Sequence, residues 1–408
     1  MYFNLEIATV SKCNMACTYC FEGEELKTKK KQTPENLDDI INKIEEMLYN
    51  PDFQKTYPQG ICVNFWGGEP TLNFEWNKTL ILKLSEKSYS NKISFFMYSN
   101  GYNDYKIFQH LDLFNKEELA KGKFRLQISW DGINNGRVNH KLEPTNVRVR
   151  RHILELAIKY PELNLSTKAT IQPQELEQLE IIWKSYFSLF KELKEKVPNS
   201  NTQINFSPTL NYVDDFDDTN EIYLENLKRE FSKVSKLEEI FYQKYKFHLF
   251  GWFSENPQDA RSKRLTNCSA GINMLAIDYD GKLTTCHGAL YSEKGNEFKE
   301  FHNLDIKESK ETFFPKFFES KEKLEKHTNY VANNCITCEA TVCYKCPIVN
   351  IEQIDNHPNK ENKDKSFQEQ FQIRDTRHCS IYKLFGKFDR IQMSEKILNF
   401  KGKENVIN

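Results

Sequence analysis

The sequence NLEIATVSKCNMACTYCF (residues 4–21) leads from an apolar run into three cysteines, Cys13, Cys17 and Cys20, with the spacing C-x3-C-x2-C. Its first part is rich in β-branched and apolar residues, which is typical of a β-strand. The cysteines follow this strand directly, so we expect them in the loop at its carboxyl end. Three thiolates suit a metal site with one open position, and they also suit a zinc site with a distant fourth ligand.

Further runs of the same character recur through the first half of the chain, and segments with helical spacing lie between them. The strand-like runs are residues 61–66, 93–99, 125–130, 165–171 and 203–208, and the helical segments are about 33–49, 73–90, 103–121, 146–160 and 174–196. The first helix is expected to have Thr33 as its N-cap and Pro34 at its first position. This alternation predicts parallel strands with right-handed crossovers, hence an α/β barrel or an open doubly wound sheet. In both folds the chemistry lies at the carboxyl ends of the strands.

The composition narrows the classes of function. The 408 residues include 57 Lys and Arg against 58 Asp and Glu, a net charge of -1, so there is no basic excess and we expect no nucleic-acid partner. No run approaches the roughly 18 apolar residues of a membrane span, and the first residues do not resemble a signal peptide, so we expect a cytoplasmic protein with no membrane contact. In that reducing compartment, grouped cysteines indicate metal or catalytic sites. Cys62 stands alone in an apolar run and is expected to be a small buried hydrophobe.

The segment FWGGEP (65–70) lies at the end of the second predicted strand. Its paired glycines allow a ligand to approach the backbone and its carboxylate can take a cationic amino group, although a tight turn with a surface Glu is the simpler alternative. The cysteine spacing followed by GGEP resembles the radical S-adenosylmethionine (SAM) enzymes. The resemblance implies a partial (β/α)6 TIM-like barrel over residues 1–212, a [4Fe-4S] cluster on the three cysteines, and SAM bound by its amino group at Gly67, Gly68 and Glu69.

Two later segments match this family in the expected order. Ser99-Asn100-Gly101 ends the third strand, and Ser129-Trp130-Asp131-Gly132 ends the fourth. The resemblance implies that polar residues of both segments lie near the ribose and the carboxylate of SAM. These residues are Ser99, Asn100, Ser129 and Asp131. Family members commonly have an Arg some ten residues later that reaches the SAM carboxylate. This chain offers Lys141 there, with Arg137 nearby.

A second group of cysteines lies in the last third of the chain. Cys268 precedes IDYDGKLTTC (277–286), which predicts a β-hairpin with Asp280-Gly281 as its turn. The later cysteines include two C-x2-C pairs, which indicate a zinc ribbon, but seven ligands exceed one zinc site. The set resembles the SPASM domain, which holds two auxiliary [4Fe-4S] clusters. The resemblance implies that auxiliary cluster I takes Cys268, Cys286 and Cys346, and that auxiliary cluster II takes Cys335, Cys338, Cys343 and Cys379.

This second resemblance sets the expected domain boundaries. We expect the SAM barrel at residues 1–212, a charged helical bridge at 213–262, and a SPASM domain at 263–408 with a C-terminal amphipathic helix after Cys379. Three [4Fe-4S] clusters are then expected. Some relatives have a further cysteine where this chain has Met274, which predicts an open iron on auxiliary cluster I, a fourth ligand from elsewhere, or water.

The resemblance also implies the reaction. SAM is cleaved reductively to a 5'-deoxyadenosyl radical, which abstracts hydrogen from a substrate, and a flavodoxin or ferredoxin supplies the electron. SPASM relatives mostly act on peptides or proteins, either as maturases of ribosomal peptides or as anaerobic sulfatase maturases that form formylglycine. Sulfatase maturases typically carry Tyr, Gln and Asp where this chain has Glu22, Trp66 and His287. We therefore favour oxidative modification or crosslinking of a ribosomally made peptide, with His287 either as a general base or as a polar neighbour of a cluster.

Partners and a non-catalytic alternative complete these expectations. Only three residues precede the first strand, so a leader peptide is expected to bind a separate protein, the barrel surface or the bridge. The alternative is a metal-binding or electron-transfer protein without catalysis. GGEP and the open-site cysteine spacing argue against it, because a scaffold needs neither.

Overall fold

The computed structural model describes residues 1–20, 22, 26, 28–134, 136–206, 209–210, 216–253, 270–291, 304–328, 380–381 and 383–385. The chain divides into two compact units. The barrel unit contains residues 1–168, 189–204 and 268–329, and the second unit contains residues 169–188, 205–267 and 330–408.

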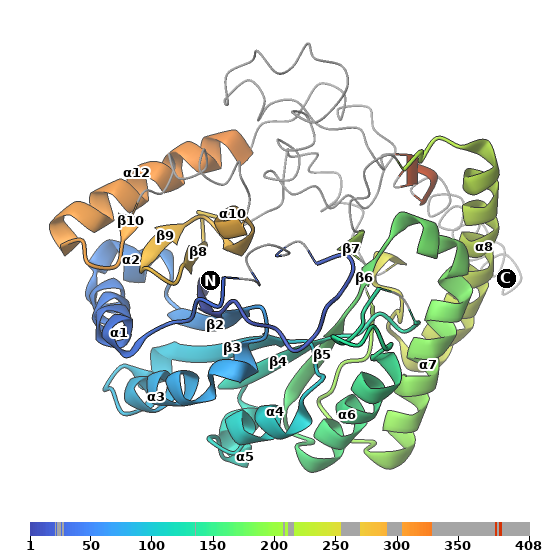
Figure 1. The fold of residues 1–408 in the computed structure, drawn as a ribbon, viewed down its shortest axis with the longest axis horizontal. Helices are drawn as coiled ribbons and strands as arrows, with labels where there is room; N and C mark the ends of the chain where they lie inside the picture. Colours follow the sequence, from blue (N-terminus) through green and yellow to red (C-terminus); the bar gives the residue numbers. More distant parts are fainter. Residues whose placement is uncertain are drawn as a thin grey trace, which may run out of the picture. The chain divides into compact units, whose positions relative to one another are not determined.

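The barrel unit is built on an eight-stranded sheet with the order β10-β9-β8-β1-β2-β3-β4-β5 (Figure 1). The strands are β1 (Phe3–Val10), β2 (Ile61–Gly67), β3 (Ile93–Ser99), β4 (Phe124–Ser129), β5 (Asn164–Lys168), β8 (Met274–Ile277), β9 (Lys282–Thr284) and β10 (Leu304–Asp305). Strands β1 to β5 are successive parallel neighbours. Their carboxyl ends therefore share one edge, which confirms the predicted α/β class and its parallel barrel sheet.

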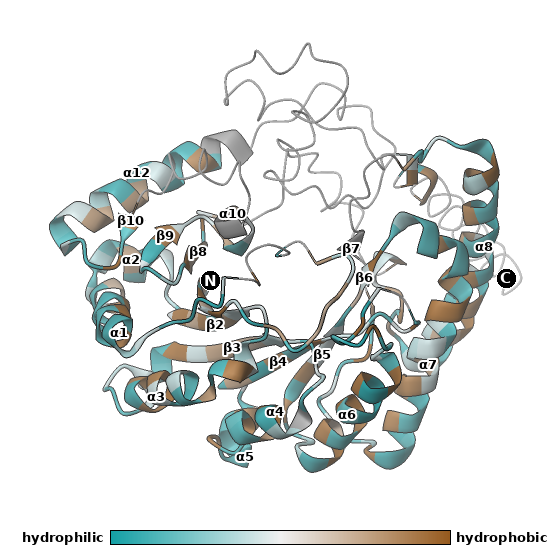
Figure 2. Cartoon of the chain, viewed as in Figure 1, coloured by the Kyte–Doolittle hydropathy of each residue, from teal (hydrophilic) through white to brown (hydrophobic). Residues whose placement is uncertain are grey.

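Amphipathic helices connect these strands. They are α1 (Pro34–Tyr49), α2 (Pro51–Thr56), α3 (Phe74–Ser85), α4 (Asp104–Leu111), α5 (Lys116–Ala120) and α6 (Asn146–Lys159), and α10 (His287–Tyr291) and α12 (Lys310–Thr328) follow β9 and β10. Helix α1 has Thr33 at its N-cap and Pro34 in its first turn, as predicted, and it buries Ile40 and Ile44. Figure 2 shows hydrophobic residues spread among hydrophilic ones along such helices. Burial of the apolar residues stabilises each helix on the sheet.

Three predicted elements differ from the structure. The strand expected at 165–171 is two strands in separate sheets, β5 and β6 (Thr170–Ile171). The single helix expected at 103–121 is wrong, because Asn115 forms a capping box with Glu118 and starts α5 as a separate helix. The strand expected at 203–208 is also wrong over its described part, where Gln203 makes an isolated bridge to Ser166. The amide of Gln203 donates to the carbonyl of Leu165 and that of Phe206 to the carbonyl of Leu249, so the segment has no single neighbouring strand along its length.

The predicted hairpin near residue 280 is confirmed, and it extends the barrel sheet. Strand β8 pairs in parallel with β1, and β9 returns antiparallel to β8. Gly281 has φ of 84°, which suits the tight turn between them. Residues 268–329 therefore lie in the barrel unit. The two compact units do not coincide with the expected segments 1–212, 213–262 and 263–408, whose separate roles stay predictions.

The second unit is mainly helical in its described part. It contains the parallel pair β6 (Thr170–Ile171) and β7 (Thr209–Leu210), the short helices η4 (Pro173–Gln178) and η5 (Gly251–Phe253), and α8 (Glu221–Tyr245), while α7 (Leu179–Lys196) is shared between the units. Helix α8 confirms a helix within 213–262, and its buried Glu238 accepts hydrogen bonds from Trp183 and Phe250. None of the helices in the described ranges is long and apolar enough to cross a membrane.

Candidate functional site

The loop after β1 carries the three predicted cluster cysteines at the carboxyl edge of the sheet. It runs against the loop that follows β4, because the amide of Ala16 donates to the carbonyl of Val138 at 2.8 Å and the amide of Thr18 donates to the carbonyl of Gly136 at 2.9 Å. The side chains of the three cysteines are half-buried thiols. Backbone pairing thus holds the cysteine loop (residues 11–20) beside a second loop of the same edge.

The paired glycines of GGEP lie against the chain that enters the cysteine loop. A Cβ on Gly67 would stand 2.3 Å from the carbonyl oxygen of Val10, and a Cβ on Gly68 would stand 2.3 Å from that of Ser11. Gly67 also has φ of 129°, which side-chain-bearing residues rarely adopt. These glycines are therefore required for close contact between two backbone segments, and their expected contact with SAM stays a prediction.

The carboxylate of Glu69 links the ends of β2 and β3. Glu69 is 1% exposed. Its Oε1 accepts from the hydroxyls of Thr71 at 2.7 Å and Ser99 at 2.9 Å, and its Oε2 accepts from the backbone amide of Asn100 at 2.8 Å. Burial raises the pKa of Glu69, and the hydrogen bonds from Thr71, Asn100 and Ser99 oppose that rise. Two predicted SAM-site segments, GGE and SNG, are thus joined by this side chain.

Asn100 connects the end of β3 to the first cysteine. Its Nδ2 lies 3.4 Å from Cys13 Sγ and donates to Asn14 Oδ1 at 2.7 Å, while its Oδ1 accepts from the amide of Tyr102 at 2.9 Å. Burial and the charge of Glu69 raise the pKa of the Cys13 thiol to about 12. A metal that binds this sulfur must displace its proton, so metal binding and thiol deprotonation are coupled.

Asp131 joins the end of β4 to the cysteine loop. Its Oδ2 forms a 3.1 Å ion pair with Arg137 Nε and accepts a hydrogen bond from the hydroxyl of Tyr19, which lies between Cys17 and Cys20. Asp131 and Arg137 are 1% and 7% exposed. Burial lowers the pKa of Arg137, but the nearby Asp131 more than compensates and the pKa is raised. The hydrogen bond from Tyr19 therefore connects the cysteine loop to this ion pair. Contact between Asp131 and SAM stays a prediction.

The remaining predicted SAM residues lie on or near the same edge. Ser129 is the half-buried last residue of β4, and Lys141 is exposed on the following loop. The backbone amide of Lys141 donates to Asn139 Oδ1 at 2.8 Å. His140, which the sequence reading did not single out, lies with its Nε2 3.0 Å from the carbonyl oxygen of Cys13. The loop after β4 therefore brings several polar groups to the cysteine loop.

The donor set fits a [4Fe-4S] cluster. Within the described ranges, no three His, Cys, Asp or Glu side chains converge as ligands of one metal ion. In a [4Fe-4S] cluster each thiolate binds a different iron, so its ligands need not meet at one point. Cys13, Cys17 and Cys20 provide three such thiols, and their assignment to this cluster stays a prediction.

The auxiliary ligand sets fall mostly outside the described residues. Of the seven cysteines, Cys286 is described and is buried. Six lie outside the described ranges, namely Cys268, Cys335, Cys338, Cys343, Cys346 and Cys379. The two auxiliary clusters therefore stay predictions.

Glu6 is a second site residue, besides His140, that the sequence analysis did not single out. It is fully buried in β1, and its Oε2 accepts from the backbone amide of His287 at 3.0 Å and lies 2.7 Å from His287 Nδ1. Burial lowers the pKa of His287, but the Glu6 carboxylate outweighs it and the pKa is raised. The imidazole stacks on Trp66 with ring centroids 3.9 Å apart. In the sequence, the feature that could have indicated Glu6 is an acidic residue within an otherwise largely apolar strand.

Solved structures of other proteins share the fold of this chain. The structure "Native anSMEcpe with bound AdoMet and Cp18Cys peptide" has a TM-score of 0.53 and 17% identity, with 82% of this chain and 85% of that chain covered. "Native anSMEcpe with bound AdoMet" has a TM-score of 0.55 and 16% identity, with 82% and 86% covered. The anSMEcpe protein is a SPASM-domain anaerobic sulfatase-maturating enzyme. No curated protein matches this chain.

The family assignment rests on the same part of the chain as the site. The family model described as the radical SAM superfamily matches residues 7–171. This range contains the cysteine loop, GGEP, and the ends of β3 and β4. Residues 7–171, together with the site that they carry, therefore match the radical SAM superfamily of enzymes.

Proposed function

We propose that this enzyme modifies a ribosomally made peptide by radical chemistry and installs a crosslink or another oxidative modification. The observation that carries the proposal is the fold shared with anSMEcpe over 82% of the chain, since one structure of that protein holds AdoMet and a peptide together. The cysteine loop, anchored at the ends of three neighbouring strands, supports the same reading.

The proposed cofactor site follows from these anchors. Cys13, Cys17 and Cys20 would hold the [4Fe-4S] cluster. SAM would lie across the strand ends, against Gly67, Gly68, Glu69, Ser99, Asn100, Ser129, Asp131 and Lys141. When bound together, the cluster and SAM supply a 5'-deoxyadenosyl radical that takes hydrogen from the substrate. The chain itself fixes the loop through Glu69, Asn100 and Asp131.

The proposed substrate wall is aromatic. Trp66 directly precedes the GGE segment. Its ring centroid lies 5.3 Å from that of Tyr98 and 3.9 Å from that of His287. All three side chains are half-buried, so they offer surface to a ligand. Glu6 orients the imidazole of His287, as expected for a group that moves a proton at the substrate.

Formylglycine formation is the second candidate, because anSMEcpe is a sulfatase-maturating enzyme. Two of the three positions that depart from sulfatase maturases, Trp66 and His287, stack on each other. These two departures therefore form one local change beside the GGE segment. This supports a different substrate side chain, and we rank peptide maturation first.

Auxiliary clusters and partners complete the proposal. The clusters would use the cysteines from Cys268 to Cys379 and would take up the electron left on the substrate or bind the substrate. A flavodoxin or ferredoxin would reduce the enzyme, and a separate protein would present the leader peptide.

The test uses the full chain, reconstituted anaerobically with iron and sulfide and supplied with SAM and dithionite. One arm contains a short peptide encoded beside the gene, and the other contains a cysteine peptide of the sulfatase type. Mass spectrometry should show loss of hydrogen from the first peptide and no aldehyde in the second. Formylglycine in the second peptide alone would overturn the proposal in favour of sulfatase maturation.

A further inference from the structure

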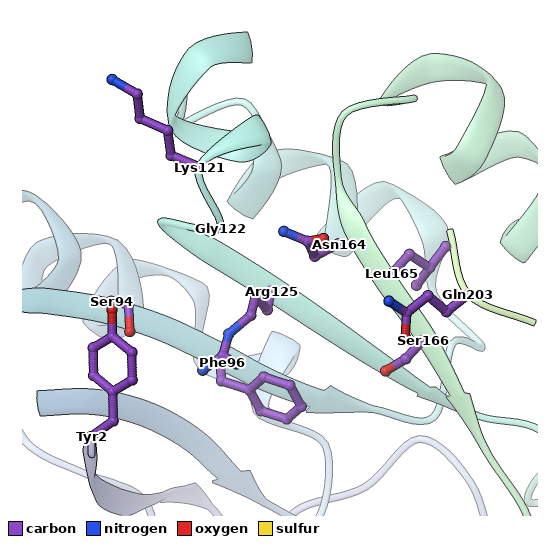
Figure 3. Close-up of a pocket in the computed structure, with 10 residues that line it drawn as sticks. All are labelled: Tyr2, Ser94, Phe96, Lys121, Gly122, Arg125, Asn164, Leu165, Ser166 and Gln203. Atoms are coloured by element: carbon purple, nitrogen blue, oxygen red, sulfur yellow. The ribbon is translucent and has the colours of Figure 1, made fainter. Parts of the chain in front are cut away.

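A cavity of about 420 Å³ lies among residues from the amino-terminal ends of the barrel strands (Figure 3). Ser94 and Arg125 are second residues of β3 and β4, and Asn164 is the first residue of β5. The cysteine loop follows the opposite, carboxyl end of β1. The cavity is therefore separate from the site of the cysteine loop, and its volume suits a small ligand.

Arg125 places a cation at this cavity. Its Nη2 lies 3.1 Å from Cys62 Sγ, and its guanidinium lies 5.4 Å from the ring centroid of Phe96. A thiol sulfur is a weak acceptor, and a guanidinium has five N–H donors. Among the described residues no carboxylate forms an ion pair with this half-buried Arg. A cation withdrawn from water without a counter-ion is unfavourable, so an anion should be attracted here.

Ser94 supplies a second, independent observation. It is 8% exposed, and its buried hydroxyl has no hydrogen-bond partner in the described structure. Strand β3 lies between β2 and β4, and the Arg125 side chain crosses it to reach Cys62. Figure 3 shows Arg125 between Ser94 on one side and Asn164 on the other. A ligand oxygen at this point would satisfy the buried hydroxyl.

The other residues that line the cavity indicate what else the ligand should contain. Phe96 and Leu165 contribute apolar surface, and the amides of Asn164 and Gln203 add neutral donors. Lys121 also borders the cavity, but Figure 3 shows its ammonium pointing away from the other residues. One planar guanidinium with neutral donors matches a carboxylate, which accepts two parallel hydrogen bonds from Arg.

We propose that this cavity binds a carboxylate attached to a short apolar stem. The carboxylate would face Arg125 and the Ser94 hydroxyl, and the stem would lie against Phe96 and Leu165. Two sources share this chemistry, namely a free small carboxylic acid and the C-terminal carboxylate of a peptide. The proposal does not depend on the radical reaction.

Isothermal titration of the reconstituted full chain with pentanoate tests the proposal, with neutral pentanamide as the matched ligand. No SAM or reductant is present, so a failure of the radical chemistry would not affect the result. Pentanoate should bind at least about tenfold more tightly than pentanamide, because charge-assisted hydrogen bonds are lost with the amide. Equal or undetectable binding of the two compounds would overturn the proposal.

Three variants locate the binding. Arg125→Gln should weaken pentanoate binding about tenfold, and Ser94→Ala should weaken it severalfold while leaving the fold intact by circular dichroism. Lys116→Gln is the control, since it removes one exposed positive charge on α5 that does not border the cavity. Wild-type affinity in the folded Ser94→Ala and Arg125→Gln variants would contradict the assignment.

The source of the carboxylate is distinguished with a short peptide that ends in leucine. Binding of its free-acid form but not its amidated form would support a peptide terminus as the ligand. Binding of pentanoate but of neither peptide would support a free small acid.

Discussion

Replacing Asp131 by Asn removes the charge that neutralises the buried guanidinium of Arg137. The 3.1 Å pair is 8% and 1% exposed at its side chains, and Tyr19 of the cysteine loop donates to the same carboxylate. Loss of one partner leaves the other charge buried without this counter-charge. Such losses typically cost about 3–5 kcal/mol of unfolding free energy. We expect this range for Asp131→Asn.

A double-mutant cycle separates the pair from its surroundings. Arg137→Met alone removes this counter-charge from the buried carboxylate and should cost a similar amount. The double variant removes both charges of the pair. Its loss of unfolding free energy should therefore be smaller than the sum of the two single losses by about 2 kcal/mol. Tyr19→Phe removes one hydrogen bond to the charged carboxylate and should cost about 1.5–3 kcal/mol.

Urea unfolding of the metal-free, reduced chain measures these free energies, and iron per chain after reconstitution measures the effect on the cysteine loop. The single variants should also retain less iron, because the loop loses its anchor at the end of β4. The control is Glu117→Gln, which breaks the exposed 2.6 Å pair with Lys121 and should change neither readout. Strictly additive costs for Asp131→Asn and Arg137→Met would refute the reasoning.

Three further substitutions test other contacts of the site. Gly68→Ala places a Cβ 2.3 Å from the Ser11 carbonyl oxygen, and urea unfolding should show a loss of about 1–3 kcal/mol. Asn100→Asp turns a donor 3.4 Å from Cys13 Sγ into a negative charge, so iron content after reconstitution should fall while the metal-free chain stays folded. Trp66→Gln removes the ring that stacks on the imidazole, and chromatography should show unchanged deoxyadenosine formation without peptide but reduced peptide turnover.

Each of these substitutions has an outcome that contradicts its premise. A fully stable Gly68→Ala variant would mean that the close backbone contact is not required. Normal iron content in Asn100→Asp would separate Asn100 from the cluster site. Full peptide turnover by Trp66→Gln would remove the aromatic wall from the proposed substrate site.

The sequence predicts the repeating elements of the barrel well, because strand and helix periodicity are local properties. The pattern of Ile40 and Ile44 on one face of α1 is visible without any tertiary contact. The order of the parallel strands β1 to β5 follows from short right-handed crossovers. The hairpin at Asp280-Gly281 is equally local, but its pairing with β1 is not, since it joins segments some 270 residues apart.

The site is predicted less completely, since its contacts depend on tertiary structure. The glycines of GGEP suggest close approach, but only the fold shows that Val10 and Ser11 are the neighbours. In the sequence, Glu6 is an acidic residue in a largely apolar strand. Its partner His287 lies 281 residues away, so the sequence alone does not predict their contact. The sequence places Arg137 near Lys141, the candidate for SAM, but it does not show that Arg137 pairs with Asp131.

The central claim is that Cys13, Cys17 and Cys20 support radical cleavage of SAM. The most direct measurement is 5'-deoxyadenosine formed by the anaerobically reconstituted chain with SAM and dithionite, compared with a variant in which these three cysteines are alanine. We predict deoxyadenosine from the wild-type chain and none from the variant. An iron-loaded wild-type chain that forms no deoxyadenosine, or a variant that forms as much, would contradict the claim.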